Sequence, residues 1–198
     1  MYLRRVDLYG FKSFAREMTI ELAPGITVLV GPNGGGKSNV VDAIRWVLGE
    51  QRLKELRADR WEDLLYAGGP GRRPAQMAEA FLEFDNTDGA MPNWPEVLRV
   101  GRRYYRQGES EYLVGSRPAR LRDVADLFLD SGLGRAAYAI IGQGRVEATL
   151  TQRPQDRLEQ LEEAAGTTRY KVRRRETRQH LQQVLGELTR AAKTAMLQ

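Results

Sequence analysis

The sequence lacks cysteine and has a single histidine among its 198 residues. Without thiols there is no disulfide framework and no thiolate metal site, which suits a protein of the cytoplasm. His180 stands in a polar stretch, where we expect a solvated surface residue rather than a metal ligand or a general base. No apolar run approaches the roughly 20 residues that cross a bilayer, and the first residues lack the apolar core of a signal peptide. We therefore expect no membrane partner and no disulfide-stabilised fold.

The charge balance is basic but moderate. The formal net charge is +5 and the pI is near 9.6, with 29% charged and 41% hydrophobic residues. This composition is typical of a soluble globular protein, and the length allows one core or a core with an appendage. Excess positive charge favours a polyanionic partner, although an ordinary solvated surface explains this number equally well.

Apolar periodicity predicts both strands and helices. Residues 3–8, 18–22 and 26–30 alternate like paired strands, and residues 40–48 have helical spacing, with Gly49 as the expected end of that helix. The elements expected further along are a strand over 78–84, a loop over 86–95, a hairpin of 96–106 and 111–114, a helix over 121–128 and a buried strand over 138–141.

Beyond Pro154 the composition changes to a stretch dense in Glu, Gln, Arg and Leu. A 3-4-3-4 spacing, the period of a coiled-coil seam, relates Leu181, Val184, Leu188, Ala191 and Ala195. We therefore expect a globular part over 1–165 and the beginning of an outgoing coiled-coil arm over 166–198. The alternative is a terminal amphipathic helix that packs on its own domain.

A glycine-rich loop follows the third apolar run. Residues 31–38, GPNGGGKS, fit G-x-x-x-x-G-K-[ST] without mismatch, between an apolar run and a helical pattern. Glycines let the backbone wrap around phosphates, and the N–H groups at the start of the helix supply positive potential. Lys37 can reach the β- and γ-phosphates, and the Ser38 hydroxyl can ligate Mg²⁺. The residues expected to contact the nucleotide in this stretch are Pro32, Asn33, Gly34, Gly35, Gly36, Lys37, Ser38 and Asn39.

A dinucleotide-binding loop does not fit the same stretch, because Asn39 stands where the third glycine of G-x-G-x-x-G is required. The loop therefore predicts a nucleoside triphosphate site. By itself it does not choose among kinases, GTPases and motor ATPases.

Several further motifs occur in order along the chain. They are GFKSF (10–14), PGITVLVGPNGGGKSNVVDAIRWVLGEQ (24–51), LRADRWEDLLYAG (56–68), GESEYLV (108–114), DSGLGRAAYAIIGQGRVE (130–147) and RLEQLEEAAGTTRYK (157–171). With them the sequence resembles the N-terminal half of the ATPase head of structural maintenance of chromosomes (SMC) proteins, of the ABC-type ATPase group and of the bacterial chromosome-partition branch. The resemblance implies an α/β P-loop NTPase lobe, with a mixed β-sheet around the P-loop helix, that ends in the start of a coiled-coil arm. Gly35, where the family more often has serine, should leave the phosphate cradle intact.

The resemblance assigns a catalytic set and the cofactors ATP and Mg²⁺. Gln143 falls at the family's Q-loop glutamine, which would contact the nucleotide, a Mg²⁺-bound water and the attacking water. Arg57 falls at the R-loop arginine, whose planar and always charged guanidinium suits developing phosphate charge. Lys37, Arg57 and Gln143 are therefore the implied catalytic residues, and Ser38 and Gln143 would serve the metal.

Three other residues receive binding roles from the resemblance. Lys12 and Ser13 of GFKSF would lie near the phosphates and the ribose of the nucleotide. Tyr66 lies where the family contacts the base and could stack on adenine. Core packing is the alternative for Tyr66, as it is for the neighbouring Trp61.

Two motifs of a complete ABC-type site are missing from the sequence. No run of four apolar residues precedes Asp-Glu, and there is no Leu-Ser-Gly-Gly. In the SMC family these motifs lie in a C-terminal head lobe, beyond two coiled-coil arms and a hinge. The resemblance therefore implies that this lobe of the same protein is a partner, with a second head in a homodimer and a kleisin-type bridging subunit. The 198-residue chain alone should hydrolyse ATP negligibly.

Positive charge is concentrated at the start of the expected arm and in a second cluster of Arg117, Arg120 and Arg122. Six basic residues lie at the start of the expected arm, namely Arg169, Lys171, Arg173, Arg174, Arg175 and Arg178. Arg60, Arg120 and Arg122 are the residues expected to face DNA, in contacts that do not depend on base sequence. A solvated coiled-coil face is the alternative for the arm cluster.

The expected function is chromosome condensation and segregation by a nucleoid-associated protein of the cytoplasm, driven by ATP. A related recombination-repair ATPase is the main alternative, and the length of the arm and the type of apex beyond residue 198 would separate the two. A non-catalytic piece that binds a partner is a third possibility, which Lys37-dependent binding of Mg-ATP would contradict.

Overall fold

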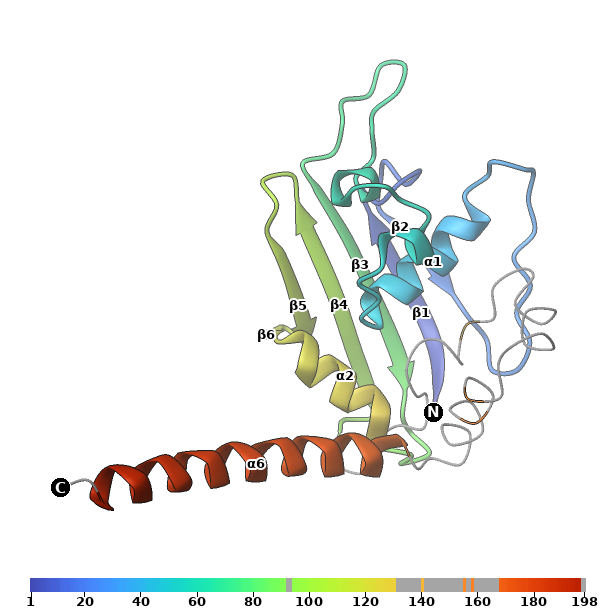
Figure 1. Cartoon of the computed structure of the whole chain (residues 1–198). Coiled ribbons are helices and arrows are strands. Elements are labelled where there is room, and N and C mark those ends of the chain that lie inside the picture. The colour runs from blue at the N-terminus through green and yellow to red at the C-terminus, as the bar shows by residue number, and fades with distance from the viewer. Residues whose placement is uncertain (92–93, 131–139, 141–154, 156–157, 159–167, 197–198) are drawn as a thin grey trace. The chain divides into compact units, whose positions relative to one another are not determined.

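A computed structural model describes residues 1–91, 94–130, 140, 155, 158 and 168–196 (Figure 1). The chain divides into two compact units, residues 1–141 and 142–198. None of the helices in the described part of the chain is long and apolar enough to cross a membrane.

The first unit is built on a six-stranded sheet in the order β2-β1-β3-β4-β5-β6, and all the described pairs are antiparallel. The strands are β1 (Tyr2–Tyr9), β2 (Met18–Glu21), β3 (Met77–Asp85), β4 (Val97–Tyr105), β5 (Ser110–Val114) and β6 (Arg117–Ala119). The predicted strands at 3–8, 18–22 and 78–84 and the predicted hairpin are confirmed. β6 was not predicted, because three residues are too few to show a period.

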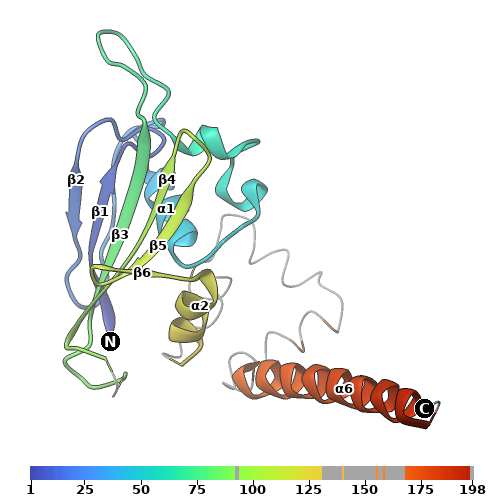
Figure 2. The same ribbon diagram turned by 90° about the vertical axis from the view of Figure 1, so that its left-hand side faces the viewer.

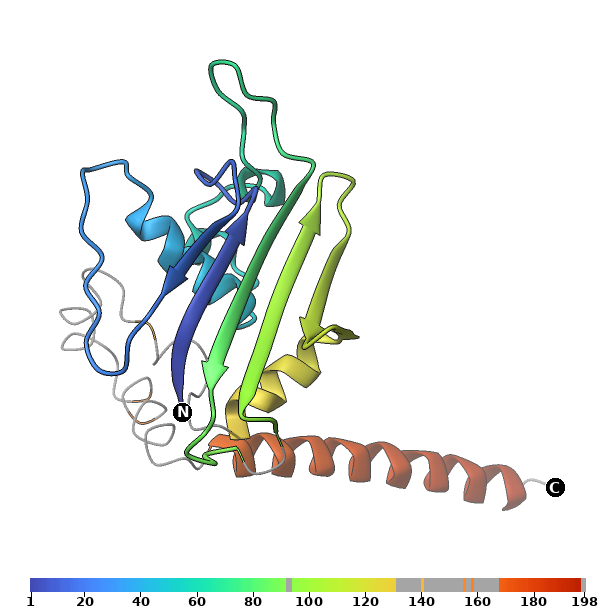
Figure 3. The same cartoon turned by 180° about the vertical axis from the view of Figure 1, so that it is seen from behind.

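One face of the sheet carries the core. Along β3 the inward residues Ala78, Ala80, Leu82 and Phe84 are buried, which is the period of two expected for a strand with one covered face. Helix α1 (Lys37–Val47) lies across that face, and Figure 2 shows it on one side of the sheet. Its buried residues include Val40, Ala43, Trp46 and Val47. Figure 3 shows the opposite face of the sheet, over which neither α1 nor any 3₁₀ turn that follows it lies. The expected sheet around the P-loop helix is confirmed.

Helix α2 (Leu121–Asp130) confirms the helix predicted over 121–128. It packs on the same face of the sheet as α1, since the ring of Phe128 lies 5.5 Å from that of Phe84. Two short 3₁₀ helices, η1 (Leu53–Leu56) and η2 (Trp61–Leu64), follow α1 and were not predicted. The strand predicted over 138–141 lies almost wholly outside the described residues.

The prediction of a strand over 26–30 is wrong for this structure. These residues form no strand, and the side chains of Ile26, Val28 and Val30 are 94%, 72% and 87% exposed. A strand needs a neighbour for its backbone N–H and C=O groups. None of the six described strands pairs with this segment, so its β-forming sequence has no strand partner among the described residues.

In the second unit, helix α6 (Thr168–Met196) confirms that the basic, heptad-bearing stretch is helical. The seam residues Leu181, Val184 and Leu188 are exposed along it. The boundary between a globular part and an arm at 165/166 stays a prediction.

Candidate nucleotide-binding site

The glycine-rich loop leads directly into the N-terminus of α1. Gly34 and Gly36 have φ angles of 80° and 87°, the left-handed region in which a Cβ is strained. Gly36 is the N-cap of α1, and the first turn of the helix contains no acidic residue. The N–H groups of that turn therefore meet neither a capping side chain from the N-cap nor a competing carboxylate. This end of an 11-residue helix suits an anion.

Lys37 lies over the loop. Its Nζ donates hydrogen bonds of 2.7 Å to the backbone carbonyls of Gly31 and of Pro32, at the beginning of the loop. The ammonium is thus held at the first two residues of the loop that leads into the helix N-terminus, the end of a helix that attracts phosphate oxygens. Ser38, the next residue, lies on the first turn of α1. Its hydroxyl is available as one ligand for a metal ion that is shared with the phosphates.

The GFKSF turn packs against this loop. A Cβ on Gly36 would come within 2.8 Å of the Ser13 hydroxyl and 3.3 Å of the Phe14 ring. Ser13 also accepts a hydrogen bond of 2.8 Å from Nδ2 of Asn39. The predicted binding residues Ser13, Gly36 and Asn39 are therefore brought together at the start of α1.

A buried carboxylate organises the cations next to this point. Asp42, on the second turn of α1, is 1% exposed. It accepts 2.5 Å from Nζ of Lys12 and 2.7 Å from Nη2 of Arg57. Nη2 of Arg57 also donates to Oδ1 of Asn39 at 3.0 Å. Lys12 and Arg57, which are far apart in the sequence, thus share one carboxylate beside the phosphate loop.

Sequence reasoning missed Asp42. One signal could have pointed to it: Asp42 is the only acidic residue in α1, within the stretch of apolar residues that covers the sheet. A carboxylate that is buried with an apolar helix face must be paired with cations or hydrogen-bond donors. Nothing in the spacing shows that Lys12 and Arg57 are those cations, because turns outside α1 carry both.

The two aromatic candidates lie elsewhere. Trp61 packs against β4, with its ring 6.1 Å from Tyr104 and 5.2 Å from the guanidinium of Arg102. The backbone N–H of Tyr66 donates to the carbonyl of Gly10, and the Tyr66 hydroxyl would lie 3.0 Å from a Cβ on Gly69. No described contact joins either ring to the phosphate loop, so a base-stacking role for Tyr66 stays a prediction.

The metal site is incomplete in the part of the chain that the structure describes. In that part no group of three or more Asp, Glu or His side chains could hold a metal ion. Gln143, the other predicted metal ligand, lies outside the described residues. Ser38 with the phosphates fits a shared Mg²⁺, which keeps most of its ligands from water and substrate.

The three arginines predicted to face DNA are all exposed. Arg60 and Arg120 precede η2 and α2, and the backbone N–H of each donates to an aspartate three residues later, Asp63 at 2.8 Å and Asp123 at 2.9 Å. The bond from Arg60, together with one from the backbone N–H of Asp59, holds the pKa of Asp63 below its usual value. Arg122 forms an ion pair of 3.7 Å with Asp126 on the same helix. No described contact links the three side chains to each other.

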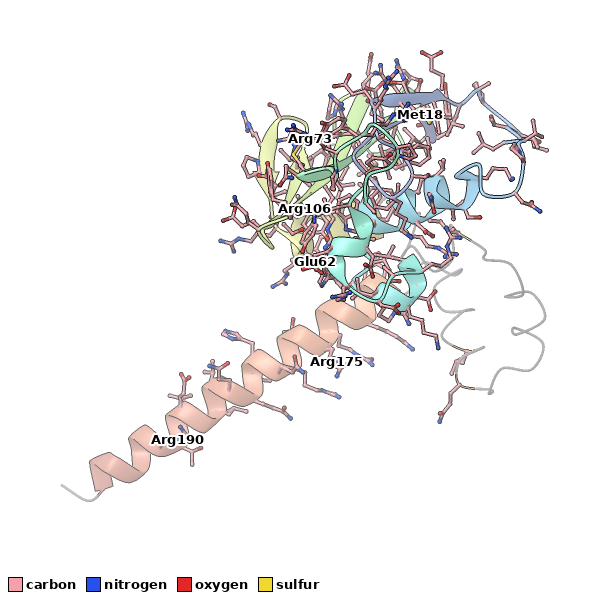
Figure 4. All side chains as sticks on the ribbon, turned by 90° about the horizontal axis from the view of Figure 1, so that it is seen from above. Met18, Glu62, Arg73, Arg106, Arg175 and Arg190 are labelled. Carbon is pink, nitrogen blue, oxygen red and sulfur yellow. The ribbon has the colours of Figure 1, made fainter. Side chains whose placement is uncertain are left out.

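Part of the basic cluster at the start of α6 can also be placed. Lys171, Arg174, Arg175 and Arg178 are exposed, and Figure 4 labels Arg175 and Arg190 along this helix. Exposed arginines on a helix fit phosphate contacts and a solvated arm equally well, so the DNA-binding residues stay predictions.

Comparison with known proteins identifies relatives of the chain. A sequence model of the family "RecF/RecN/SMC N terminal domain" matches residues 2–181. The chromosome partition protein Smc of Bacillus subtilis is 46% identical over 190 residues, which are 96% of this chain and 16% of that protein. The chain therefore spans about a sixth of the length of this curated relative.

Solved structures with the same fold include SMC heads. An Smc head domain from Pyrococcus furiosus, with an extended coiled coil and bound to the C-terminal domain of ScpA, has a TM-score of 0.80 and 32% identity, over 96% of this chain and 48% of that one. A chain from a study of ATP-driven dimerization and DNA-stimulated activation of SMC ATPases has a TM-score of 0.75 and 33% identity, over 82% of this chain and 99% of that one.

Proposed function

The chain belongs to the RecF/RecN/SMC N-terminal domain family, and we propose that it is the ATP-binding half of an SMC-type ATPase head. The observation that carries the proposal is the convergence of Lys37, Ser13 and the Lys12–Asp42–Arg57 cluster on the first turns of α1. The ammonium of Lys37, the half-exposed guanidinium of Arg57 and the helix N–H groups then lie close to a loop whose glycines admit phosphates. The identity to Smc of Bacillus subtilis favours a role in chromosome partition over one in repair.

Each of these groups has a task toward the triphosphate. The loop N–H groups and Lys37 bind the β- and γ-phosphates, and Ser38 offers its hydroxyl to the metal. Arg57 presents a guanidinium to charge that develops on the transferred phosphoryl group. Mg²⁺, when bound with ATP, neutralises phosphate charge and orients the phosphates for attack by water. Gln143 keeps its proposed task of orienting that water.

The same proposal requires a second lobe. The described residues supply no acidic cluster for Mg²⁺, and the sequence contains neither Walker B nor signature motif. Residues 26–30 have a strand-forming sequence, and no described strand pairs with them. A C-terminal lobe that contributes acidic residues and neighbouring strands would supply both the missing Mg²⁺ ligands and a strand partner for residues 26–30. We call this chain together with that lobe the completed head. ATP-driven pairing of two completed heads and a ScpA-like kleisin partner are proposed from the solved relatives.

Turnover tests the proposal directly. We expect the 198-residue chain alone to hydrolyse ATP at least about 100-fold more slowly than the completed head, because the base and most metal ligands are missing. Phosphate release under saturating Mg-ATP measures both rates. Lys37→Ala should abolish turnover by the completed head. Robust Lys37-dependent turnover by the chain alone would contradict the need for a second lobe, and a completed head that neither binds nor hydrolyses ATP would contradict the function.

DNA binding is the second part of the proposal. Reversing the charge of Arg60, Arg120 and Arg122 together, each to Glu, should weaken binding of duplex DNA by the completed head. Each phosphate contact that is lost should reduce the slope of log K against log salt by about 0.9. Fluorescence anisotropy at several salt concentrations gives this slope. The loss should be the same for DNA of different sequence.

A matched variant separates local contact from net charge. Arg16→Glu, Arg72→Glu and Arg73→Glu together change the charge by the same amount at exposed positions outside the predicted surface. If this control weakens DNA binding as much as the first triple variant, the predicted surface is wrong and only net charge matters.

A further inference from the structure

Two residues of the cluster beside the phosphate loop are held in an unfavourable backbone conformation. Lys12 and Arg57, with φ angles of 47° and 50°, are the only non-glycine residues with positive φ in the described part of the chain. A residue with a Cβ in this region costs on the order of 1–2 kcal/mol. Both side chains end on the same carboxylate, that of Asp42. Backbone strain at two separate turns therefore has one common result, the placement of two cations at one point.

The end of a short helix does not account for this arrangement. Arg57 is the C-cap of η1, a place where left-handed backbone is common. Glycine or asparagine would serve that cap with less strain, and the cap does not direct a guanidinium to α1. Lys12 belongs to no helix. The shared carboxylate is thus the feature that the two strained residues have in common.

Asp42 binds its two cations differently. The Lys12 side chain is 10% exposed, and its ammonium also donates to the carbonyl of Leu56, so it is enclosed. The Arg57 side chain is 51% exposed. Its Nε lies 3.1 Å and its Nη2 2.7 Å from Oδ2 of Asp42, and Nη2 also reaches Asn39. Asp42 therefore takes the Nε–Nη2 edge of the guanidinium. Nη1 has no hydrogen bond to any residue that the structure describes.

We propose that Asp42 is a positioning residue that holds Arg57 by this edge, so that Nη1 stays directed to a phosphate oxygen of the bound nucleotide. Lys12 balances the charge of the carboxylate, because a buried carboxylate with a half-exposed arginine alone would be undercompensated. Asn39 ties Arg57 to Ser13, which lies against Gly36 of the loop. This inference rests on the proposed function, since it assumes that Arg57 acts on ATP.

The burial pattern favours positioning over a purely structural ion pair. The enclosed ammonium of Lys12 already pairs with the buried carboxylate of Asp42, so the half-exposed Arg57 is not needed to neutralise it. A preorganised guanidinium, by contrast, acts on developing charge without reorganising during the reaction. The structure thus maintains a strained residue whose benefit lies in what it presents to a ligand.

Steady-state kinetics of the completed head test the inference. Asp42→Asn keeps the shape of the side chain and removes its charge. We expect kcat to fall about 10- to 100-fold, as far as in Arg57→Ala, with KM for ATP within about threefold of the wild type. The double variant should be no slower than Arg57→Ala alone, because both substitutions remove the same oriented guanidinium. Additive losses in the double variant would overturn the proposal.

A second measurement does not depend on turnover. In nitrogen-15 spectra of the 198-residue chain without nucleotide, Arg57 Nε–H should give a slowly exchanging signal, assigned by its loss in Arg57→Ala. Asp42→Asn should remove that signal or make it exchange rapidly, since both carboxylate oxygens now accept from Nε. A signal that persists unchanged in Asp42→Asn would show that Asp42 does not orient Arg57.

Two further variants keep the test decisive. If Asp42→Asn fails to fold, Lys12→Met with Asp42→Asn removes both enclosed charges, and low kcat compared with Lys12→Met alone is still expected. Asn86→Ala is the structural control: Asn86 is 3% exposed and bonded to Met91, at the opposite end of β1 and β3 from the loop. It should lose stability but keep kcat per folded molecule. If Arg57→Ala leaves kcat unchanged while Lys37→Ala abolishes it, the role of Arg57 fails and the nucleotide site stands.

Discussion

Alanine in place of Gly36 should weaken nucleotide binding by the completed head by about 100-fold or more, which corresponds to roughly 2.7 kcal/mol. The φ angle of 87° at Gly36 strains any residue with a Cβ. The new methyl group would also come within 2.8 Å of the Ser13 hydroxyl and 3.3 Å of the Phe14 ring. Phe14 is buried and cannot move aside freely. Ser13 can rotate only by giving up its hydrogen bond from Asn39. The loop and the first turn of α1 would therefore shift.

Titration with a fluorescent ATP analogue measures this loss, and Gly115→Ala provides its control. Gly115 also has positive φ, 62°, but a Cβ there would meet nothing within 4 Å. Gly115→Ala should cost about 1 kcal/mol of stability through strain and leave nucleotide affinity unchanged. If both variants bind the analogue as the wild type does, the close packing of the GFKSF turn on the loop has no part in binding.

Methionine in place of Arg102 should lower the free energy of unfolding by about 3 kcal/mol. Arg102, on β4, is 2% exposed and lies among the rings of Trp46, Trp61 and Tyr112, 4.6–5.2 Å from its guanidinium. Its Nη1 donates to the carbonyls of Trp46 and Glu50 at 3.1 and 3.0 Å. Burial lowers the pKa of Arg102 to about 10, so the side chain still carries its charge near neutral pH.

Methionine fills much of the volume of Arg102 but donates no hydrogen bond. The carbonyl of Trp46, in the last turn of α1, and that of Glu50, three residues beyond the helix, would then lose a charged donor, a cost of about 1–3 kcal/mol each before relaxation and before relief of the buried charge. Urea unfolding of the 198-residue chain, followed by tryptophan fluorescence, measures the change. Removal of the buried charge should itself stabilise the core and oppose the loss of the hydrogen bonds. If Arg102→Met is as stable as the wild type, this stabilisation outweighs the lost hydrogen bonds and the prediction is wrong.

Arg103→Met is the matched control on the same strand. Arg103 points to the other face of the sheet, where its side chain is 32% exposed and paired with Glu79 and Glu111. Because exposed ion pairs contribute little, this variant should change stability by less than about 1 kcal/mol. Neighbouring arginines thus differ in effect because one anchors α1 to the sheet and the other meets solvent.

The parts of the site that depend on local chemistry could be predicted. Glycines, a lysine and a helix start within eight residues define the phosphate loop, and the structure places Gly36 and Lys37 at the beginning of α1. The paired strands and the hairpin are predicted by alternation in the same way. The role of Asp42 as the shared partner of Lys12 and Arg57 could not be predicted. Both cations lie in turns, and the periodicity of the sequence does not predict the geometry of turns. Gln143 stays a prediction from family resemblance.

Residues 26–30 show how a prediction from local sequence preference alone can fail. Their sequence, ITVLV, predicts a strand from propensity alone. Propensity does not supply a hydrogen-bonding neighbour, and none of the described strands does so. A correct interpretation of the local preference therefore gave a wrong element, since strand formation depends on residues far away in sequence or in another lobe. Helix α1 did not have this difficulty because its backbone hydrogen bonds are internal.

If a second lobe completes this sheet, as proposed, the exposed ITVLV segment would make the order of assembly important in the cell. It has five uncharged, mostly β-branched residues and no proline, the composition of segments that pair with copies of themselves. Encounters between two unpaired lobes rise with the square of their concentration. Docking of a completing lobe on the same polypeptide depends instead on a fixed effective concentration, whatever the abundance of the protein. Carrying both halves of a head on one chain would then protect each newly made molecule from its neighbours.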